Sequence, residues 1–221
     1  MKSDLLFHIG PIDIGNAVVT TWGIMAAFAI LLPFAARRFS VEPGLIQTAL
    51  EGIVSAMLDA IDAVIPGKSE MLLPFIGTLW IFILVSNLCG IVPGLSSPTG
   101  NLSVTAALAV TVFLSVHWYG IRSEGLKRYL KHYTSPSPIL LPFHLISEVS
   151  RTVALAVRLF GNIMSLEMAA LLVLLVGGLI VPIPLLMLHI VEALVQAYIF
   201  GMLALIYVSG SIESQQRRKN E

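Results

Sequence analysis

The stretch Met71-Leu-Leu-Pro-Phe-Ile-Gly-Thr-Leu-Trp-Ile-Phe-Ile-Leu-Val-Ser-Asn-Leu-Cys-Gly-Ile-Val-Pro-Gly-Leu95 contains no aspartate, glutamate, lysine or arginine. A helix rises about 1.5 Å per residue, so about twenty apolar residues cross the ~30 Å hydrocarbon core of a bilayer. Four other stretches also lack these four residue types, and they occupy residues 17–36, 102–121, 168–188 and 193–212. The sequence therefore predicts an all-α polytopic membrane protein with about five transmembrane helices.

Composition supports a membrane protein and argues against several soluble classes. Of the 221 residues, 57% are hydrophobic and 12% are charged, whereas an ordinary soluble domain has about 25% charged residues. The 13 lysines and arginines balance the 13 aspartates and glutamates, which leaves no positive surplus for binding nucleic acid. The chain has neither a GxxxxGKS/T phosphate loop nor a His-Glu-x-x-His motif, so we expect it to bind no nucleotide, metal or cofactor.

Residues 42–65 form an amphipathic segment between the first two apolar stretches. Apolar residues recur at helical spacing along one side, at Leu45, Ala49, Ile53, Met57, Ile61 and Val64. Polar residues occupy the opposite side, at Gln47, Glu51, Ser55, Asp59 and Asp62. A helix of this kind is too polar to span a bilayer. The pattern therefore predicts a helix that lies along the membrane surface or packs on a partner.

The positions of lysine and arginine indicate how the chain is threaded, because positively charged loops tend to stay in the cytoplasm. The expected spans are residues 17–36, 71–95, 102–121, 138–177 and 182–212. Basic residues follow the first span, the amphipathic segment, the third span and the last span, at Arg37, Arg38, Lys68, Arg122, Lys127, Arg128, Lys131, Arg217, Arg218 and Lys219. All of them fall on one side if the N-terminus lies outside. We therefore expect a single membrane domain over residues 1–221 with a cytoplasmic C-terminus.

The fourth span, residues 138–177, is unusually long and carries four ionisable groups. About forty residues make a helix of ~60 Å, so this span must be strongly tilted or kinked, and with residues 182–212 it predicts a long tilted hairpin. Glu148 and Arg151 are three residues apart, which favours a structural ion pair. Arg158 has no acidic residue three or four positions away. An isolated arginine at membrane depth costs about 3 kcal/mol, and it usually faces a polar interior or an ion path.

Other polar residues of the two long spans fall into register with Arg158. Asn162 follows Arg158 by one turn on the same face, whereas Glu167 lies on roughly the opposite side of the helix. In the last span, His189, Glu192 and Gln196 form one polar stripe. Counted along the helices, the carboxylates and the imidazole lie nearer the outer turn than Arg158 does. This pattern predicts a titratable path that opens to the outside and stops near a fixed positive charge, with Gln196 as a hydrogen-bond acceptor for Arg158.

These residues carry a resemblance to a known family. The string Arg158-Leu159-Phe160-Gly161-Asn162, followed by Glu167 and then by His189 and Gln196, closely resembles subunit a of the F-type ATP synthase membrane sector. A carboxylate nine positions after the arginine and the His/Gln pair in the last helix make the match specific. The resemblance covers residues 138–210, and a weaker match covers residues 98–105.

The resemblance implies a stator subunit of a rotary complex that is not an enzyme by itself. Its last two helices would curve along a rotor ring of c subunits, with Arg158 facing the ring carboxylate and separating an outer from an inner half-channel. Peripheral-stalk b subunits and membrane lipid would be further partners, and the location would be a bacterial inner membrane. The transported ion would be the proton, with a sodium-translocating version of the same subunit as the alternative.

By the same resemblance, Asn162, Glu167, His189 and Gln196 match positions of the outer path or of the arginine's surroundings. Glu192 stands where many members place a polar or acidic residue. This chain has Asn101 where the family often has aspartate. Asn101 is therefore a possible channel entrance that lacks the usual carboxylate.

Two other classes of membrane protein compete with this interpretation. A stand-alone secondary transporter or channel would show a repeated pair of broken helices, whereas here one hairpin holds nearly all the charge of the spans. An intramembrane hydrolase would need a nucleophile and a base, for which only Ser165 and His189 could be named. Neither class has a sequence pattern of comparable strength.

Overall fold

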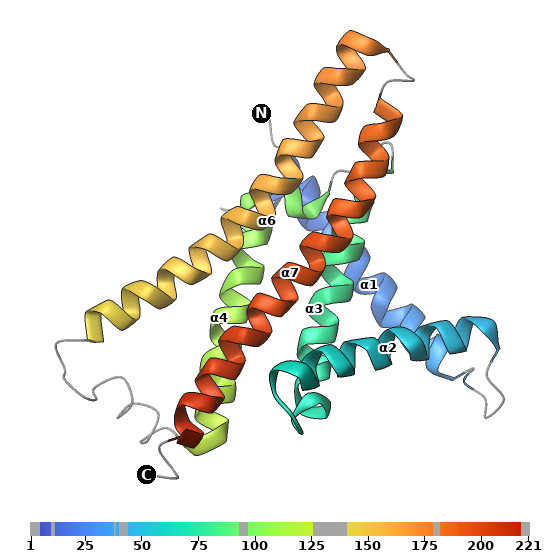
Figure 1. Ribbon diagram of the computed structural model, residues 1–221. Helices are drawn as coiled ribbons and strands as arrows, with labels where there is room; N and C mark the ends of the chain where they lie inside the picture. Colours follow the sequence, from blue (N-terminus) through green and yellow to red (C-terminus); the bar gives the residue numbers. More distant parts are fainter. Residues whose placement is uncertain are drawn as a thin grey trace.

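The computed structural model describes residues 5–9, 12–37, 39, 44–92, 97–125, 141–178 and 182–217. Its elements, in chain order, are strands β1 (Leu5–Ile9) and β2 (Ile12–Gly15), the helices α1 (Asn16–Ala36), α2 (Leu45–Val64) and α3 (Ser69–Cys89), the 3-10 helix η1 (Pro98–Gly100), and the helices α4 (Leu102–Glu124), α6 (Leu141–Gly177) and α7 (Pro182–Arg217). Five of the helices, α1, α3, α4, α6 and α7, are long and apolar enough to cross a membrane. The predicted all-α polytopic fold is therefore confirmed (Figure 1).

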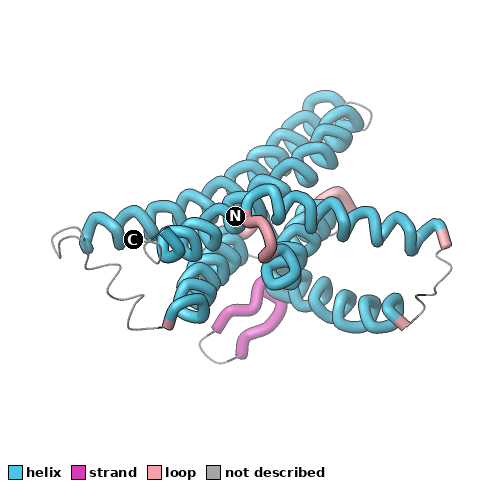
Figure 2. Tube along the Cα trace, turned by 60° about the horizontal axis from the view of Figure 1, so that its bottom comes forward, coloured by secondary structure: helices cyan, strands magenta, loops and turns pink. Residues whose placement is uncertain are grey.

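A small antiparallel hairpin of β1 and β2 precedes α1, and the sequence did not predict it. Figure 2 shows that this hairpin lies at the edge of the helical assembly. Two short strands cannot form a core of their own. The hairpin therefore adds to the N-terminus without changing the fold class.

The boundaries of the predicted spans shift by a few residues. The amphipathic segment expected at residues 42–65 contains α2, Leu45–Val64, whose first expected residues lie outside the described part of the chain. The span expected at 71–95 is α3, which begins two residues earlier and ends at Cys89. The start expected for the fourth span at residue 138 also lies outside the described residues, and α6 is described from Leu141.

The last two helices form the predicted long hairpin, because α6 has 37 residues and α7 has 36. Figure 1 shows that the two helices run side by side toward their shared turn and diverge away from it. Helix α7 packs on α3, α4 and α6. The shorter α2 crosses the bundle near the end opposite the hairpin turn (Figure 1).

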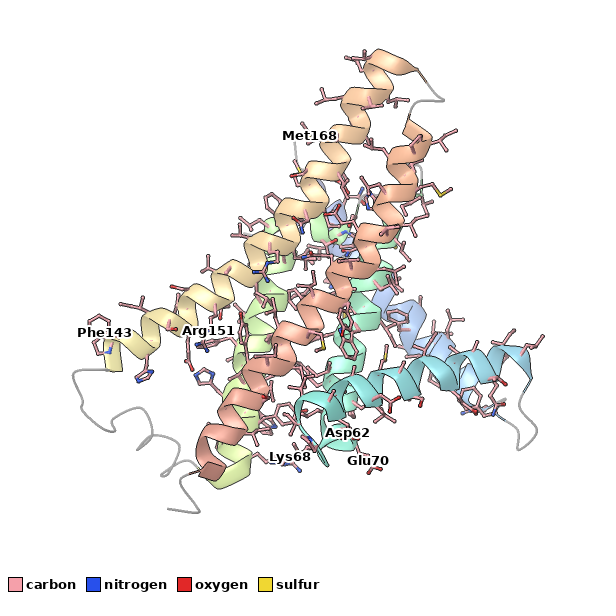
Figure 3. The ribbon with its side chains drawn as sticks, viewed as in Figure 1. Asp62, Lys68, Glu70, Phe143, Arg151 and Met168 are labelled. Atoms are coloured by element: carbon pink, nitrogen blue, oxygen red, sulfur yellow. The ribbon has the colours of Figure 1, made fainter. Side chains whose placement is uncertain are left out.

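A tight turn fixes the angle between α2 and α3. Gly67 has a φ of 76°, a left-handed conformation that glycine adopts without steric cost. Its backbone N–H donates to the Asp62 carboxylate at 3.2 Å. Figure 3 shows Asp62, Lys68 and Glu70 close to this turn. The charged residues thus collect where the amphipathic helix meets the first residues of a span.

The core of the bundle lies where α2, α3, α4, α6 and α7 meet. Small residues let α7 approach its neighbours closely, since Ala193, Ala197 and Ala204 are buried, and close backbone approach is a main source of helix association in membranes. The Trp80 indole of α3 lies over Gly201, and its Nε1 donates to the Tyr198 carbonyl at 3.2 Å. This packing places α7 between α3 and α6, where its polar stripe faces both helices.

Candidate functional site

Arg158 lies on the exposed side of α6, away from the core of the bundle. The residues on the same side one turn before and two turns after it, Ala154 and Ser165, are exposed as well. No described residue makes a hydrogen bond or an ion pair with Arg158. Many other exposed residues of the hairpin helices are apolar, among them Val157 of α6 and Leu194 of α7. The guanidinium is therefore a fixed positive charge on an otherwise apolar surface.

Asn162, one turn after Arg158, forms the polar link between the two hairpin helices. Its Nδ2 donates a hydrogen bond to Gln196 Oε1 at 2.8 Å. Gln196 is only 2% exposed, and its Nε2 has no hydrogen-bond partner. The carbonyl oxygen that we expected to accept from Arg158 thus accepts from Asn162, which lies one turn after Arg158 on α6.

The Glu167 side chain lies on the opposite side of α6 from Arg158, where it meets η1 and the end of α3. Built on the Gly100 backbone, a Cβ would lie 3.1 Å from Oε2 of Glu167, and on Gly90 it would lie 3.3 Å from Oε1. Oε1 is buried and makes no hydrogen bond with any of the described residues. The half-turn offset that nine residues impose on a helix therefore separates the carboxylate from the guanidinium, as predicted.

His189 of α7 completes this side of the site. The ring is 4% exposed, its Nε2 has no hydrogen-bond partner, and it lies within electrostatic range of the Glu167 carboxylate. Glu192 is half-buried one turn further along α7. Within the described ranges, no hydrogen bond or ion pair joins Glu192 to Glu167 or His189, and no group of three or more His, Cys, Asp and Glu side chains could hold a metal ion.

A buried polar network that sequence reasoning missed supports Glu167 from the α3 side. Thr99 Oγ1 donates to Asn87 Oδ1 at 2.6 Å, and the hydroxyls of Ser97 and Thr99 are 2.7 Å apart. Asn87 Nδ2 also donates to the Ala193 carbonyl of α7 at 3.5 Å. The sequence could have indicated a role for Asn87, because it is an amide inside an uncharged span, where polar groups need partners. The two hydroxyl residues gave no comparable signal.

Asn101, the possible channel entrance, has a structural role in the described fold. Its Oδ1 accepts a hydrogen bond from the Ser103 backbone N–H at 2.9 Å, which makes it the N-cap of α4. Asparagine and aspartate are equally good at this position, since each offers an oxygen to the first free N–H groups of a helix. The exposed side chain of Asn101 lies next to Gly100, which contacts Glu167.

The expected ion pair of Glu148 with Arg151 is replaced by two other contacts. Glu148 Oε2 lies 3.4 Å from His117 Nε2 of α4. The Arg151 guanidinium lies over the Tyr207 ring of α7, 5.6 Å from its centroid, and Figure 3 shows Arg151 on the N-terminal half of α6. Both residues therefore bind neighbouring helices, and such tertiary contacts outcompete a weak local pair between residues three apart.

Comparison of the sequence with known proteins shows which family the chain resembles. Residues 18–209 match the family model described as ATP synthase A chain. The chain is 59% identical over 215 residues to ATP synthase subunit a 2 of Pelobacter propionicus, covering 97% of this chain and 94% of that protein. It is 58% identical over 211 residues to ATP synthase subunit a of Legionella pneumophila, covering 95% and 92%. It is also 61% identical over 213 residues to ATP synthase subunit a 1 of Hahella chejuensis, covering 96% and 91%.

Proposed function

Because the chain belongs to the ATP synthase A chain family, we propose that it is the stator subunit that carries ions through the membrane sector of a rotary ATP synthase. Two offset half-channels would meet at its interface with a ring of c subunits. The subunit would not be an enzyme by itself, since ATP chemistry would belong to other subunits. Peripheral-stalk b subunits and lipid would be its further neighbours in a bacterial inner membrane.

Arg158, which is exposed and pairs with no residue in the described part of the chain, is the observation that carries this proposal. A guanidinium stays protonated under all physiological conditions, and a charge on an apolar face at membrane depth requires a partner or water. A carboxylate on a neighbouring ring would supply that partner. Arg158 could then attract each deprotonated ring carboxylate without itself passing protons, which would keep the two half-channels apart.

The outer half-channel would run along Glu167 and His189, with Glu192 one turn beyond His189 on α7, toward Asn162 and Gln196. Buried polar atoms without a protein partner occur at Glu167, His189 and Gln196. Such atoms are ordinarily satisfied by water or by a transferred ion. These three residues come from both helices of the hairpin, so a continuous polar route between α6 and α7 is supported.

Coupling follows from forcing the ion to travel on the moving ring. Each elementary charge that crosses 100 mV releases about 2.3 kcal/mol, and a barrier at Arg158 would convert this energy into rotation. The basic residues Arg37, Lys68 and Arg122 favour an outside N-terminus and a cytoplasmic C-terminus. The proton is the proposed ion, and sodium is the alternative, because ion selectivity would reside mostly in the ring carboxylate site.

The test uses the assembled complex in membrane vesicles. Arg158→Ala should abolish ion-driven ATP synthesis while leaving the subunit in the complex, because the residue is exposed and makes no hydrogen bond or ion pair with the described part of its own chain. Normal synthesis in this variant would refute the proposal. Comparing ATP-driven acidification with and without sodium then distinguishes the two ions, since a sodium-translocating complex acidifies vesicles only when sodium is absent or scarce.

A further inference from the structure

Two glycines enclose the Glu167 carboxylate, one at the end of α3 and one in η1. We propose that Gly90 and Gly100 are positioning residues that form a slot for this carboxylate and hold it on the ion path, turned away from Arg158. The inference rests on the proposed role of Glu167 in ion transport. It adds that glycine is required at two positions for the Glu167 carboxylate to keep its place.

Neither glycine is required by its backbone conformation. Gly90 has φ −66° and ψ −14°, which is ordinary right-handed helical geometry that any residue adopts. Gly100 is not among the described glycines with positive φ, which are Gly67, Gly125 and Gly178. Alanine at either position would therefore be free of backbone strain. The need for glycine must come from the space around it.

The Glu167 side chain occupies part of the space next to both glycines. The three atoms nearest a Cβ on Gly100 all belong to Glu167, with Oε2 at 3.1 Å, Oε1 at 3.4 Å and Cδ at 3.5 Å. A Cβ on Gly90 would lie 3.0 Å from the Ser97 Cβ and 3.3 Å from Glu167 Oε1. By contrast, a Cβ on Gly52, Gly161 or Gly210 would meet nothing within 4 Å. Crowding by the carboxylate is therefore specific to the slot.

The walls of the slot have little freedom to move. Ser97, which lies between the two glycines in sequence, is 3% exposed, and its hydroxyl donates to the Ser86 carbonyl at 2.9 Å. Thr99 is fully buried and bonded to Asn87. Because these hydrogen bonds hold Ser97 and Thr99 in place, a methyl group added at Gly100 is expected to displace the carboxylate, whose atoms are the nearest to it.

The slot has a consequence for charge separation within α6. The two glycines leave room for the Glu167 carboxylate beside η1, on the side of α6 that faces away from Arg158. There Oε1 makes no hydrogen bond with the described residues, and the carboxylate lies within electrostatic range of the His189 ring. An added Cβ would shift the carboxylate by a few tenths of an ångström, and misplacement of a group that takes part in transfer lowers the rate.

Side-chain length supplies the decisive test. Gly100→Ala should lower ion-driven ATP synthesis on the order of tenfold, whereas the control Gly52→Ala, a glycine-to-alanine change on α2, should leave it unchanged. Glu167→Asp should also lower the rate, because the carboxylate withdraws by one methylene. In the double variant that combines Gly100→Ala with Glu167→Asp, the shorter aspartate side chain leaves room for the added methyl group. We expect ion-driven ATP synthesis to be several-fold faster in this double variant than in Gly100→Ala alone. If Gly100→Ala fails to assemble, Gly90→Ala provides a second test.

A structural measurement separates this inference from the proposed function. Labelling of Glu167 by a water-soluble carbodiimide, quantified by mass spectrometry, should rise in Gly100→Ala and Gly90→Ala and stay at the wild-type level in Gly52→Ala. Unchanged labelling, or a double variant no better than Gly100→Ala, would overturn the slot even if Glu167→Gln abolishes transport. Increased labelling with full transport in Glu167→Gln would instead support the slot and refute the proposed role of Glu167.

Discussion

Asn162 donates a hydrogen bond from Nδ2 to Oε1 of Gln196 at 2.8 Å, and this bond joins α6 to α7 one helical turn from Arg158. The acceptor is nearly completely buried, so an unmade bond would leave a polar atom without water. The link also holds two neutral amides beside a permanent charge. Gln196 can therefore shape the surroundings of Arg158 without neutralising it.

Substitutions at Gln196 should separate the role of charge from the role of size. Gln196→Glu nearly preserves the shape and the acceptor for Asn162, but it introduces a carboxylate that would compete with the ring carboxylate for Arg158. Gln196→Asn keeps the site neutral and only shortens the reach. Ion-driven ATP synthesis should fall further in Gln196→Glu, and equal rates in the two variants would contradict this interpretation.

The outer path should be accessible to water at Glu167 and His189. In a Cys89→Ser background, Glu167→Cys and His189→Cys should react with silver ions or membrane-impermeant thiol reagents applied from the outer side. The extent of thiol modification is the measurement, so the loss of transport does not obscure it. Leu159→Cys is the control, because this residue is fully buried in the core and should stay unmodified. Protection of both path residues would require a different route.

Asn101 should tolerate aspartate but not alanine. Asn101→Asp keeps the N-cap of α4 and adds a negative charge that favours a helix N-terminus. Asn101→Ala removes the hydrogen bond to Ser103 and should lower the free energy of unfolding by about 1 kcal/mol. Thermal denaturation of the detergent-solubilised subunit measures both changes. A stability in Asn101→Ala equal to wild type would show that the cap contributes nothing.

Gly201 should be the most sensitive glycine of α7. A Cβ at this position would overlap the Trp80 indole, which is rigid and hydrogen-bonded to Tyr198. Gly201→Ala should therefore separate α3 from α7 and destabilise the bundle by about 1–3 kcal/mol. Gly210→Ala on the same helix has nothing within 4 Å and should retain the wild-type melting temperature. Similar melting temperatures for the two variants would contradict the predicted overlap.

Hydrophobic length was enough to predict the five spanning helices, and helical spacing was enough to predict α2. Both features depend on residues close together in sequence, since a membrane segment must satisfy its own backbone hydrogen bonds. The same local rule correctly placed Arg158 and Glu167 on opposite sides of α6. It also marked His189 and Gln196 as polar groups facing other helices, and both are buried.

Contacts between distant segments decided the rest. The choice of Asn162 as the donor to Gln196, the pairing of Glu148 with His117 and the enclosure of Glu167 by two glycines all join residues from different elements. Spacing within one helix states which side a residue occupies, but it does not state which neighbouring element covers that side. Packing of α4, η1 and α7 around α6 makes that selection, because a buried polar group can bond only to a partner that the tertiary fold brings within hydrogen-bond distance.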